Sequence, residues 1–220
     1  MNKQLFLLAV IAMFATVAVA QSPDFREIEH YRKLPTQFNT ADIDSDVVTV
    51  TEMFSYSCIH CYNLEPDLKE WKERRAGMVD FEREHVVFSG TGLNLARAFY
   101  AAEELGVTEK IHDYMFSAIH VSSLRMNNEE LLVRLFEGRG ETDEATFRAA
   151  FTGFAVENRI RRSDALVRTW RIQGTPTLVV DGRYIAGGTV TRTNKQILTV
   201  VDFLVDKVLA ERRAMREVGS

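Results

Sequence analysis

The stretch Thr49-Val50-Thr51-Glu52-Met53-Phe54-Ser55-Tyr56-Ser57-Cys58-Ile59-His60-Cys61 decides how the chain folds. Residues 47–54 are rich in Val, Thr and Phe, which predicts a β-strand. A helix is predicted to follow, because apolar residues recur there at spacings of three and four. These residues are Cys61, Leu64, Leu68 and Trp71. Ser57 is a suitable cap for this helix and places Cys58 in its first turn. Both cysteines therefore lie where a strand passes directly into a helix.

Helical patterns dominate the middle of the chain. A second strand is predicted at residues 79–88, with an exposed middle because three charged residues, Glu82, Arg83 and Glu84, follow one another. Beyond it, short helices are predicted at 93–105, 108–121, 128–136 and 142–151, and a longer helix at 154–172.

Strand patterns return near the end of the chain. The Asp181-Gly182 dipeptide lies between two apolar runs within residues 177–185, which is a strong signal for a β-hairpin. A final amphipathic helix is predicted from Ile197 to the Arg212-Arg213 pair, and the tail beyond it is expected to fray. This order of elements predicts one α/β domain with an all-helical insertion. We place the α/β domain at 21–90 and 160–220 and the insertion at 91–159.

The N-terminus has the pattern of a cleavable secretory signal at residues 1–20. Lys3 precedes an apolar run, and Ala18-Val19-Ala20 supplies small residues before a polar turn at Gln21. The alternative is an uncleaved anchor, but an apolar stretch of about 16 residues is shorter than the roughly 20 that span a bilayer. We therefore expect cleavage after Ala20 and export.

The amino-acid composition limits the classes of function that the protein can have. The net charge of −4 argues against a nucleic-acid partner. Hydrophobic residues make up 46% of the chain and charged residues 26%, which suffices for a folded core. The protein is expected to act as a monomer, although the sequence does not specify the oligomeric state.

The Cys58-Ile59-His60-Cys61 motif has three possible interpretations. A structural disulfide is one, but closing a ring of about four residues stabilises a fold by only roughly 2 kcal/mol. Zinc is another, but it needs about four ligands, and no second cysteine pair exists. The remaining histidines are scattered and are expected to be surface or packing residues: His30, His85, His112 and His120. The third reading, a redox-active pair, is the one we favour.

The position of the two cysteines gives the redox-active interpretation a physical mechanism. Residues three apart on a helix lie about 5–6 Å from each other, within reach of a disulfide. Cys58, at the helix N-terminus, would face unpaired N–H groups and the positive end of the helix dipole, and a protonated His60 would add to their effect. A stabilised thiolate makes the disulfide an oxidant. Cys58 is therefore predicted to attack, and Cys61, on the apolar face, to resolve.

Three features together resemble the DsbA-type periplasmic oxidases of the thioredoxin-fold superfamily: the strand leading into Cys-x-His-Cys, a helical block of suitable size, and Gln173-Gly174-Thr175-Pro176 before the hairpin. The resemblance covers essentially the whole mature chain. It implies a thioredoxin fold with an all-helical insertion and a cis Thr175–Pro176 bond. It also implies that Thr175 presents backbone to the substrate opposite Cys58.

The resemblance gives Glu52 a role as well. Glu52 shares the face of Val48, Val50 and Phe54, and in the family the matching acid lies beneath the dithiol, relays protons and disfavours the oxidised state. The alternative is a glutamate at the sheet edge that reaches water. Ile59 departs from the family, in which many members have proline, so its effect on the redox potential is not set by the sequence.

The leading hypothesis is a disulfide donor for reduced exported proteins in the periplasm. It would need no cofactor beyond the Cys58–Cys61 pair, and a membrane quinone-linked oxidase of the DsbB kind would recharge it. An isomerase or reductase would normally carry an N-terminal dimerisation domain, and the roughly 26 residues between Gln21 and Val47 leave too little room. A non-catalytic thioredoxin-fold binding module is the third hypothesis.

Overall fold

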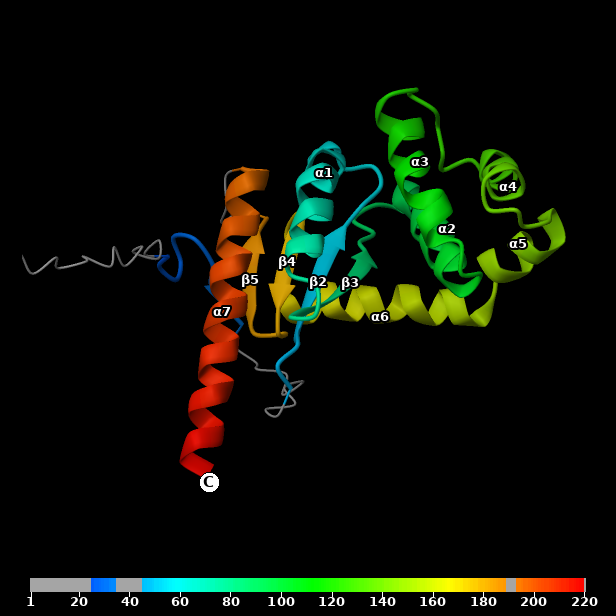
Figure 1. Ribbon diagram of the computed structural model, residues 1–220. Coiled ribbons are helices and arrows are strands. Elements are labelled where there is room, and N and C mark those ends of the chain that lie inside the picture. The colour runs from blue at the N-terminus through cyan, green and yellow to red at the C-terminus, as the bar shows by residue number, and fades with distance from the viewer. Residues whose placement is uncertain (1–24, 35–44, 189–192, 220) are drawn as a thin grey trace, which may run out of the picture.

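The computed structural model describes residues 25–34, 45–188 and 193–219 (Figure 1). The predicted signal at 1–20 lies outside these residues and stays a prediction. No helix within the described ranges is long and apolar enough to cross a membrane.

In the described part of the chain, five strands form one mixed sheet in the order β1-β5-β4-β2-β3. Strands β2 and β3 are parallel, and the other neighbouring pairs are antiparallel. The strands are β1 Arg32–Lys33, β2 Val48–Phe54, β3 Val79–His85, β4 Thr177–Val180 and β5 Tyr184–Gly187. The predicted strand at 47–54 is thus confirmed, and it lies inside the sheet between β4 and β3. The short β1 was not predicted, because two residues are too few to carry a periodic pattern.

The predicted hairpin joins β4 to β5. Asp181 and Gly182 both adopt left-handed backbone conformations, with φ of 55° and 59°. The Arg183 N–H donates to the Val180 carbonyl over 3.0 Å and closes the two-residue turn. Positive φ at both central residues matches the right-handed twist of the flanking strands, which is why Asp-Gly suits this position.

Seven α-helices and a short 3-10 helix are found in the described residues. They are α1 Ile59–Arg74, η1 Gly90–Gly92, α2 Leu93–Glu104, α3 Thr108–His120, α4 Glu129–Gly138, α5 Glu144–Phe151, α6 Phe154–Trp170 and α7 Asn194–Gly219. All the predicted helices are confirmed within a few residues. The expected fraying after Arg213 is wrong, because α7 continues to Gly219. Arg212 donates to the carbonyls of Ser45 and Val47, and Arg216 pairs with Asp46 over 2.9 Å, which ties the last turns to the start of β2.

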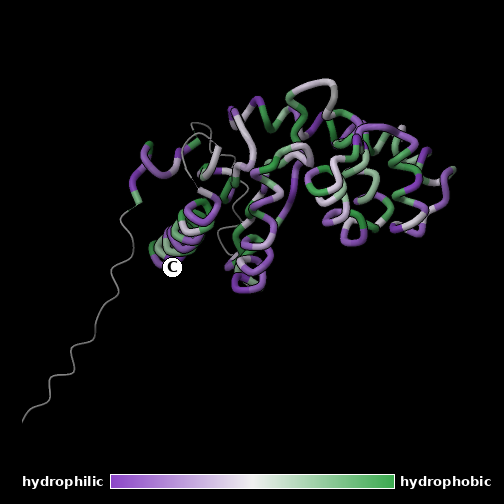
Figure 2. Tube along the Cα trace, turned by 90° about the horizontal axis from the view of Figure 1, so that it is seen from above, coloured by the Kyte–Doolittle hydropathy of each residue, from purple (hydrophilic) through white to green (hydrophobic). Residues whose placement is uncertain are grey.

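The helices form layers around the sheet (Figure 1). Helices α1 and α7 cover one face, where Leu64, Leu68 and Trp71 pack with Val48, Val50 and the apolar side of α7. The second half of α6 covers the other face through Trp170 and the following Ile172. Helices α2 to α5 form a helical unit beyond β3, and its core of aromatic and aliphatic side chains also includes Phe54, Tyr56 and Cys61. Figure 2 shows this unit standing to one side of α1 and α7, with hydrophilic residues along its outer turns.

Helix α6 joins the two parts. Its first half contacts α2 and α5, and its second half reaches β3, where the Ser163 hydroxyl donates to the His85 carbonyl over 3.0 Å. The boundary predicted between residues 159 and 160 falls within this continuous helix.

The expectation that the middle of β3 is exposed is wrong in part. Glu82 is exposed as predicted, but Glu84 is only 1% exposed and accepts a hydrogen bond from the Tyr100 hydroxyl over 2.7 Å. Arg83 is largely buried as well, since it forms ion pairs with two carboxylates. The expectation failed because a run of charges signals a solvated segment only where no partners of opposite charge pack against it.

The Arg212–Asp181 ion pair is predicted to anchor α7 to the hairpin. The two groups lie 2.7 Å apart, and both residues are almost fully buried. Arg212→Ala removes this cation and two hydrogen bonds to carbonyls, so the free energy of unfolding should fall by roughly 3 kcal/mol in a urea titration. The neighbouring Arg213 is exposed, so Arg213→Ala should change it by less than about 0.5 kcal/mol. Equal effects of the two substitutions would contradict the prediction.

Candidate active site

A tight turn carries the chain from β2 into α1. The Cys58 N–H donates to the Ser55 carbonyl over 3.0 Å, so Tyr56 and Ser57 form the corners of this turn. Cys58 is itself the N-cap residue of α1. The predicted capping by Ser57 is therefore wrong by one residue. The Ser57 hydroxyl instead forms a 2.9 Å hydrogen bond with the Ser55 hydroxyl, which stabilises the turn rather than the helix.

Cys58 lies at the surface with its sulfur facing polar groups. Its pKa is lowered from 9.0 to about 5. The hydrogen bond from the Cys61 thiol makes the largest contribution, and partial burial opposes it. The Thr175 side chain and the backbone N–H groups of Cys61 and His60 lower it further. The predicted thiolate at Cys58 thus has a geometric basis, and His60 contributes to it through its backbone.

Cys61 occupies the opposite environment one turn along the helix. It is fully buried, and burial is the main reason that its pKa is raised. The hydrogen bond to Cys58 and the negative charge of Glu52 raise it further. Both cysteines are free thiols in this structure. A half-buried, acidic sulfur and a fully buried, basic one suit the predicted roles of attacking and resolving cysteine.

The Thr175–Pro176 bond is cis, as the family resemblance implied. The loop lies against the dithiol, because the Cys58 thiol donates to the Thr175 carbonyl over 3.2 Å. Gly187, with φ of 91°, allows the close approach of this loop to β5, since a Cβ atom there would lie 2.8 Å from the Pro176 carbonyl oxygen. The two segments that the sequence singled out, 58–61 and 173–176, therefore meet in one site.

The outer surface of the site combines exposed apolar and polar groups. Ile59 is 45% exposed, and the His60 side chain is exposed beside it. The Asn194 side chain at the start of α7 donates to the His60 carbonyl over 3.0 Å and fixes the first turn of α1. Thr175 is half-buried, so Ile59 and Thr175 flank the sulfur on accessible surface.

Glu52 lies fully buried on β2 beneath the dithiol. The expectation of a buried carboxylate is confirmed, and the alternative of a sheet-edge position is wrong because β2 pairs on both sides. Burial raises its pKa from 4.5 to about 7, although the Arg83 guanidinium, 2.9 Å away, works against this. Its second oxygen, Oε1, has no hydrogen-bond partner within the described part of the chain. This carboxyl can exchange a proton near neutral pH.

Comparisons with known proteins place the chain in a family. A model described as a DSBA-like thioredoxin domain matches residues 92–198. The thiol:disulfide interchange protein DsbA of Burkholderia cepacia is 33% identical over 161 residues, which cover 73% of this chain and 76% of that relative. The DsbA of Pseudomonas aeruginosa is 28% identical over 221 residues, which cover 98% and 100%. The chain belongs to the DsbA family of thiol:disulfide oxidoreductases.

Solved DsbA structures support the same assignment. The crystal structure of DsbA from Xylella fastidiosa matches with a TM-score of 0.74 and 34% identity, and covers 82% of this chain and 96% of that one. The DsbA of Pseudomonas aeruginosa matches with a TM-score of 0.77 and 26% identity, and covers 88% and 97%. The thioredoxin fold with a helical insertion, predicted from the sequence, is thereby confirmed.

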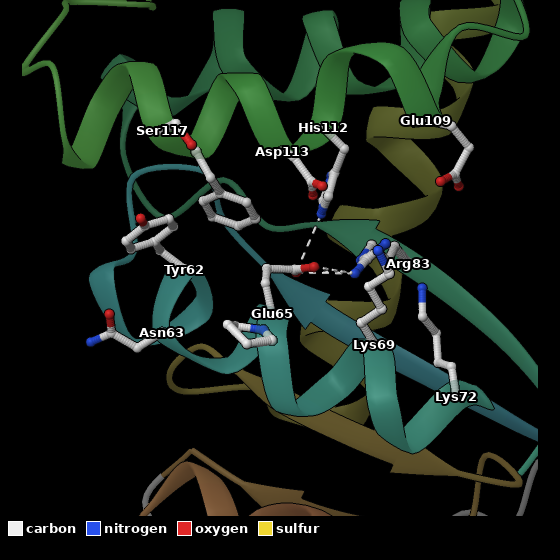
Figure 3. Close-up of a pocket in the computed structure, with 12 residues that line it drawn as sticks. Tyr62, Asn63, Glu65, Lys69, Lys72, Arg83, Glu109, His112, Asp113 and Ser117 are labelled. Carbon is white, nitrogen blue, oxygen red and sulfur yellow. Dashed lines mark hydrogen bonds and ion pairs between the residues drawn. The ribbon is translucent and has the colours of Figure 1, made fainter. Parts of the chain in front are cut away.

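This DsbA-family chain extends the buried charge at Glu52 into a network of charged groups. Figure 3 shows the part of the network that joins Arg83, Glu65 and His112. Arg83 donates from Nε to Glu52 and from Nη2 to both oxygens of Glu65 on α1, over 2.9–3.0 Å. His112 points from α3 toward Glu65, with Nε2 and Oε1 3.2 Å apart. Burial acts to raise the pKa of Glu65, but His112 and Arg83 outweigh it and lower the pKa overall.

Sequence reasoning missed these partners. One signal was available, because Glu65 follows Cys61 by four residues and so shares its helical face. Arg83 was assigned to an exposed strand, and His112 was treated as a packing residue. Only the packing of α3 against α1 brings His112 to Glu65, and β3 and α2 separate these two helices in the sequence.

Among the described residues, Glu65, His112 and Asp113 form the group that could hold a metal ion. Both oxygens of Glu65 already accept hydrogen bonds from Arg83, and Oε1 faces His112. A cation would have to displace or approach a buried guanidinium, which is electrostatically unfavourable. The donor set therefore fits an ion-pair network better than a metal centre.

The raised pKa of Glu52 predicts a pH-dependent stability. A carboxyl that titrates near pH 7 when folded and near 4.5 when unfolded leaves stability intact below about pH 4.5, and removes roughly 3 kcal/mol as the pH rises from there through 7. Glu52→Gln abolishes this titration. The reduced variant should be more stable than the parent by about that amount at about pH 8, and nearly equal to it at about pH 4.

Urea unfolding at the two pH values measures the effect. The exposed Glu82 on the neighbouring strand provides the control, since Glu82→Gln should change stability by less than about 0.5 kcal/mol at either pH. A destabilised Glu52→Gln protein at about pH 8 would show that the carboxylate is favourable where it lies.

Proposed function

We propose that this protein donates its Cys58–Cys61 disulfide to reduced exported proteins. The acidic Cys58 sulfur carries the proposal, because a stable thiolate favours the reduced enzyme and makes its disulfide an oxidant. A client thiolate attacks the Cys58 sulfur, the Cys58–Cys61 bond breaks, and Cys61 leaves. A second client thiolate then attacks the client sulfur of the mixed disulfide and releases Cys58 as thiolate. The client loses two electrons, and the enzyme gains them.

We propose that Glu52 exchanges a proton with Cys61, the buried leaving group. Cys61 is a poor thiolate because of its burial, so it needs a proton as the bond to Cys58 breaks. A carboxyl with a pKa of about 7 beneath it can supply that proton and take it back on reoxidation. The charge of Glu52 also raises the pKa of Cys61, which links the two groups.

Client contact is proposed at the surface around Cys58. The cis-Pro176 loop exposes the Thr175 backbone beside the sulfur, and an extended client segment can pair with such backbone without sequence preference. Ile59 adds exposed apolar surface next to it, which suits the hydrophobic segments of unfolded chains.

Export places this chemistry in the periplasm. The apolar run and the Ala18-Val19-Ala20 site of the N-terminal sequence support a cleaved signal. Relatives that carry the name thiol:disulfide interchange protein DsbA support a disulfide-exchange role. We further propose that the protein acts as a monomer without a bound cofactor, and that a membrane quinone-linked oxidase of the DsbB kind regenerates its disulfide.

The alternative functions are an isomerase or reductase and a non-catalytic binding module. The wild-type protein distinguishes them when it is mixed, as the disulfide, with a reduced peptide that contains two cysteines. A donor converts the peptide to its disulfide and becomes reduced, whereas an isomerase or reductase and an inert module both leave the peptide reduced. The reduced protein mixed with the oxidised peptide separates these two, because an isomerase or reductase exchanges thiols with the peptide disulfide and an inert module does not.

The Cys58 thiolate should be visible directly. In the reduced protein, ultraviolet thiolate absorbance should rise with a midpoint near pH 5, because Cys61 does not ionise in that range. Cys58→Ser should abolish this transition. Cys61→Ala should move it to higher pH, since the Cys61 thiol is the largest stabilising contact. A midpoint near 9, as for the unperturbed thiol, would overturn the proposed function.

Mixed-disulfide trapping assigns the two sulfurs. Cys61→Ser removes the resolving thiol. When this variant is mixed with a client that carries a disulfide, the Cys58 thiolate attacks one client sulfur and the other leaves as a thiolate, so a mixed disulfide on Cys58 should accumulate and should be released by added thiol reductant. Cys58→Ser, the matched control, should trap far less because Cys61 is buried and poorly ionised. Mass spectrometry of the adducts reads the outcome. Adducts formed through Cys61 alone would reverse the assignment.

A further inference from the structure

Tyr56, two residues before Cys58, is bonded to a histidine at each of its polar groups. Its N–H donates to His85 Nε2 over 3.1 Å, its hydroxyl lies 3.0 Å from His112 Nδ1, and its carbonyl lies 2.8 Å from His120 Nε2. The side chain of Tyr56 is fully buried. The three histidines, here called the Tyr56 clamp, come from β3 and α3, elements far from β2 in sequence.

The clamp fixes hydrogen roles on two of the rings. A backbone carbonyl can only accept, so His120 donates from Nε2 to Tyr56. A backbone N–H can only donate, so His85 accepts at Nε2 and carries its proton on Nδ1. Burial lowers the pKa of His85 to about 3, which keeps the ring neutral and able to accept.

This role leaves one ring nitrogen of His85 without a hydrogen bond among the described residues. Its Nδ1 is buried without a hydrogen-bond partner in the described part of the chain. An unsatisfied buried donor destabilises a fold, because the N–H has lost its hydrogen bond to water and gained none in the protein. An apolar side chain would remove that cost but would leave the Tyr56 N–H unsatisfied instead, so the imidazole stabilises the turn specifically.

His120 holds the turn from the helical unit. It lies in the last turn of α3 and stacks on Tyr62 of α1, with ring centroids 5.3 Å apart and planes inclined by 20°. His112, two turns earlier on α3, reaches both the Tyr56 hydroxyl and Glu65. The helical unit therefore contacts the polypeptide on both sides of Cys58, at Tyr56 and at Tyr62.

We propose that His85, His112 and His120 are positioning residues that fix the Tyr56 turn and thereby hold the Cys58 sulfur against Cys61 and Thr175. Tyr56 and Ser57 form the corners of the turn that ends at Cys58, so rotation of the Tyr56 peptide would displace the sulfur from both contacts. The inference rests on the proposed function and adds that the helical unit takes part in setting the reactivity of the dithiol.

His120→Ala in the full mature protein tests the clamp. It removes one donor at a half-buried position, so the fold should persist. The thiolate midpoint of Cys58 should rise by about one unit, which is the size of one net hydrogen bond expressed as a pKa. The redox equilibrium with glutathione should shift about tenfold toward the oxidised enzyme. His120→Gln, which keeps an N–H donor, should restore most of both values.

Two further variants separate positioning from stability. Tyr56→Phe removes the hydroxyl contact with His112 alone and should raise the midpoint by a smaller amount in the same direction. His30→Ala, a histidine outside the clamp, should leave it unchanged. Each variant is also unfolded in urea. Lower stability with an unchanged Cys58 midpoint in both His120→Ala and Tyr56→Phe would overturn the proposal. A wild-type midpoint near 9 would instead overturn the donor function itself, so the two failures are distinguishable.

Discussion

Two sulfur atoms three residues apart meet opposite electrostatic environments, and the rest of the structure maintains that difference. Cys58 faces hydrogen-bond donors at the start of α1, and Cys61 faces the apolar core and the charge of Glu52. A dithiol with equal sulfurs would have no preferred site of attack and little oxidising strength. The strand, the turn and the helix that carry the two cysteines place Cys58 near the solvent and Cys61, one helical turn later, in the core.

Buried charge beneath the dithiol is the second constraint. Glu52, Arg83 and Glu65 place three ionised or ionisable groups inside the protein, where apolar residues of similar size would be at least as stable. Such a network is expected where proton exchange is needed close to a buried reacting group. Arg83 bridges the two acids, so it offsets part of the desolvation that either carboxylate would suffer alone.

The helical unit also contributes side chains that contact the turn before Cys58. Its helix α3 packs against α1 and places His112 and His120 on the turn before Cys58. The sheet supplies His85 to the Tyr56 N–H, but without α3 the Tyr56 hydroxyl and carbonyl would face solvent or a void. The insertion therefore completes the environment of a turn that the sheet begins, and α6 connects the two parts as one continuous helix.

The order of elements could be read from the sequence, because strand and helix periodicities, the Asp181-Gly182 turn and the Cys58-to-Cys61 spacing are local properties of the chain. The site residues close to the motif or already implied by the family, such as Glu52 and the cis Thr175–Pro176 bond, followed from the same information. Arg83, Glu65 and the Tyr56 clamp did not. Their roles depend on which helix packs on which strand, and a charged or imidazole side chain in the sequence gives no sign of whether water or a buried partner will face it. Only the packing of the helical unit against α1 and β3 decided that these polar residues are buried, paired and joined to the dithiol.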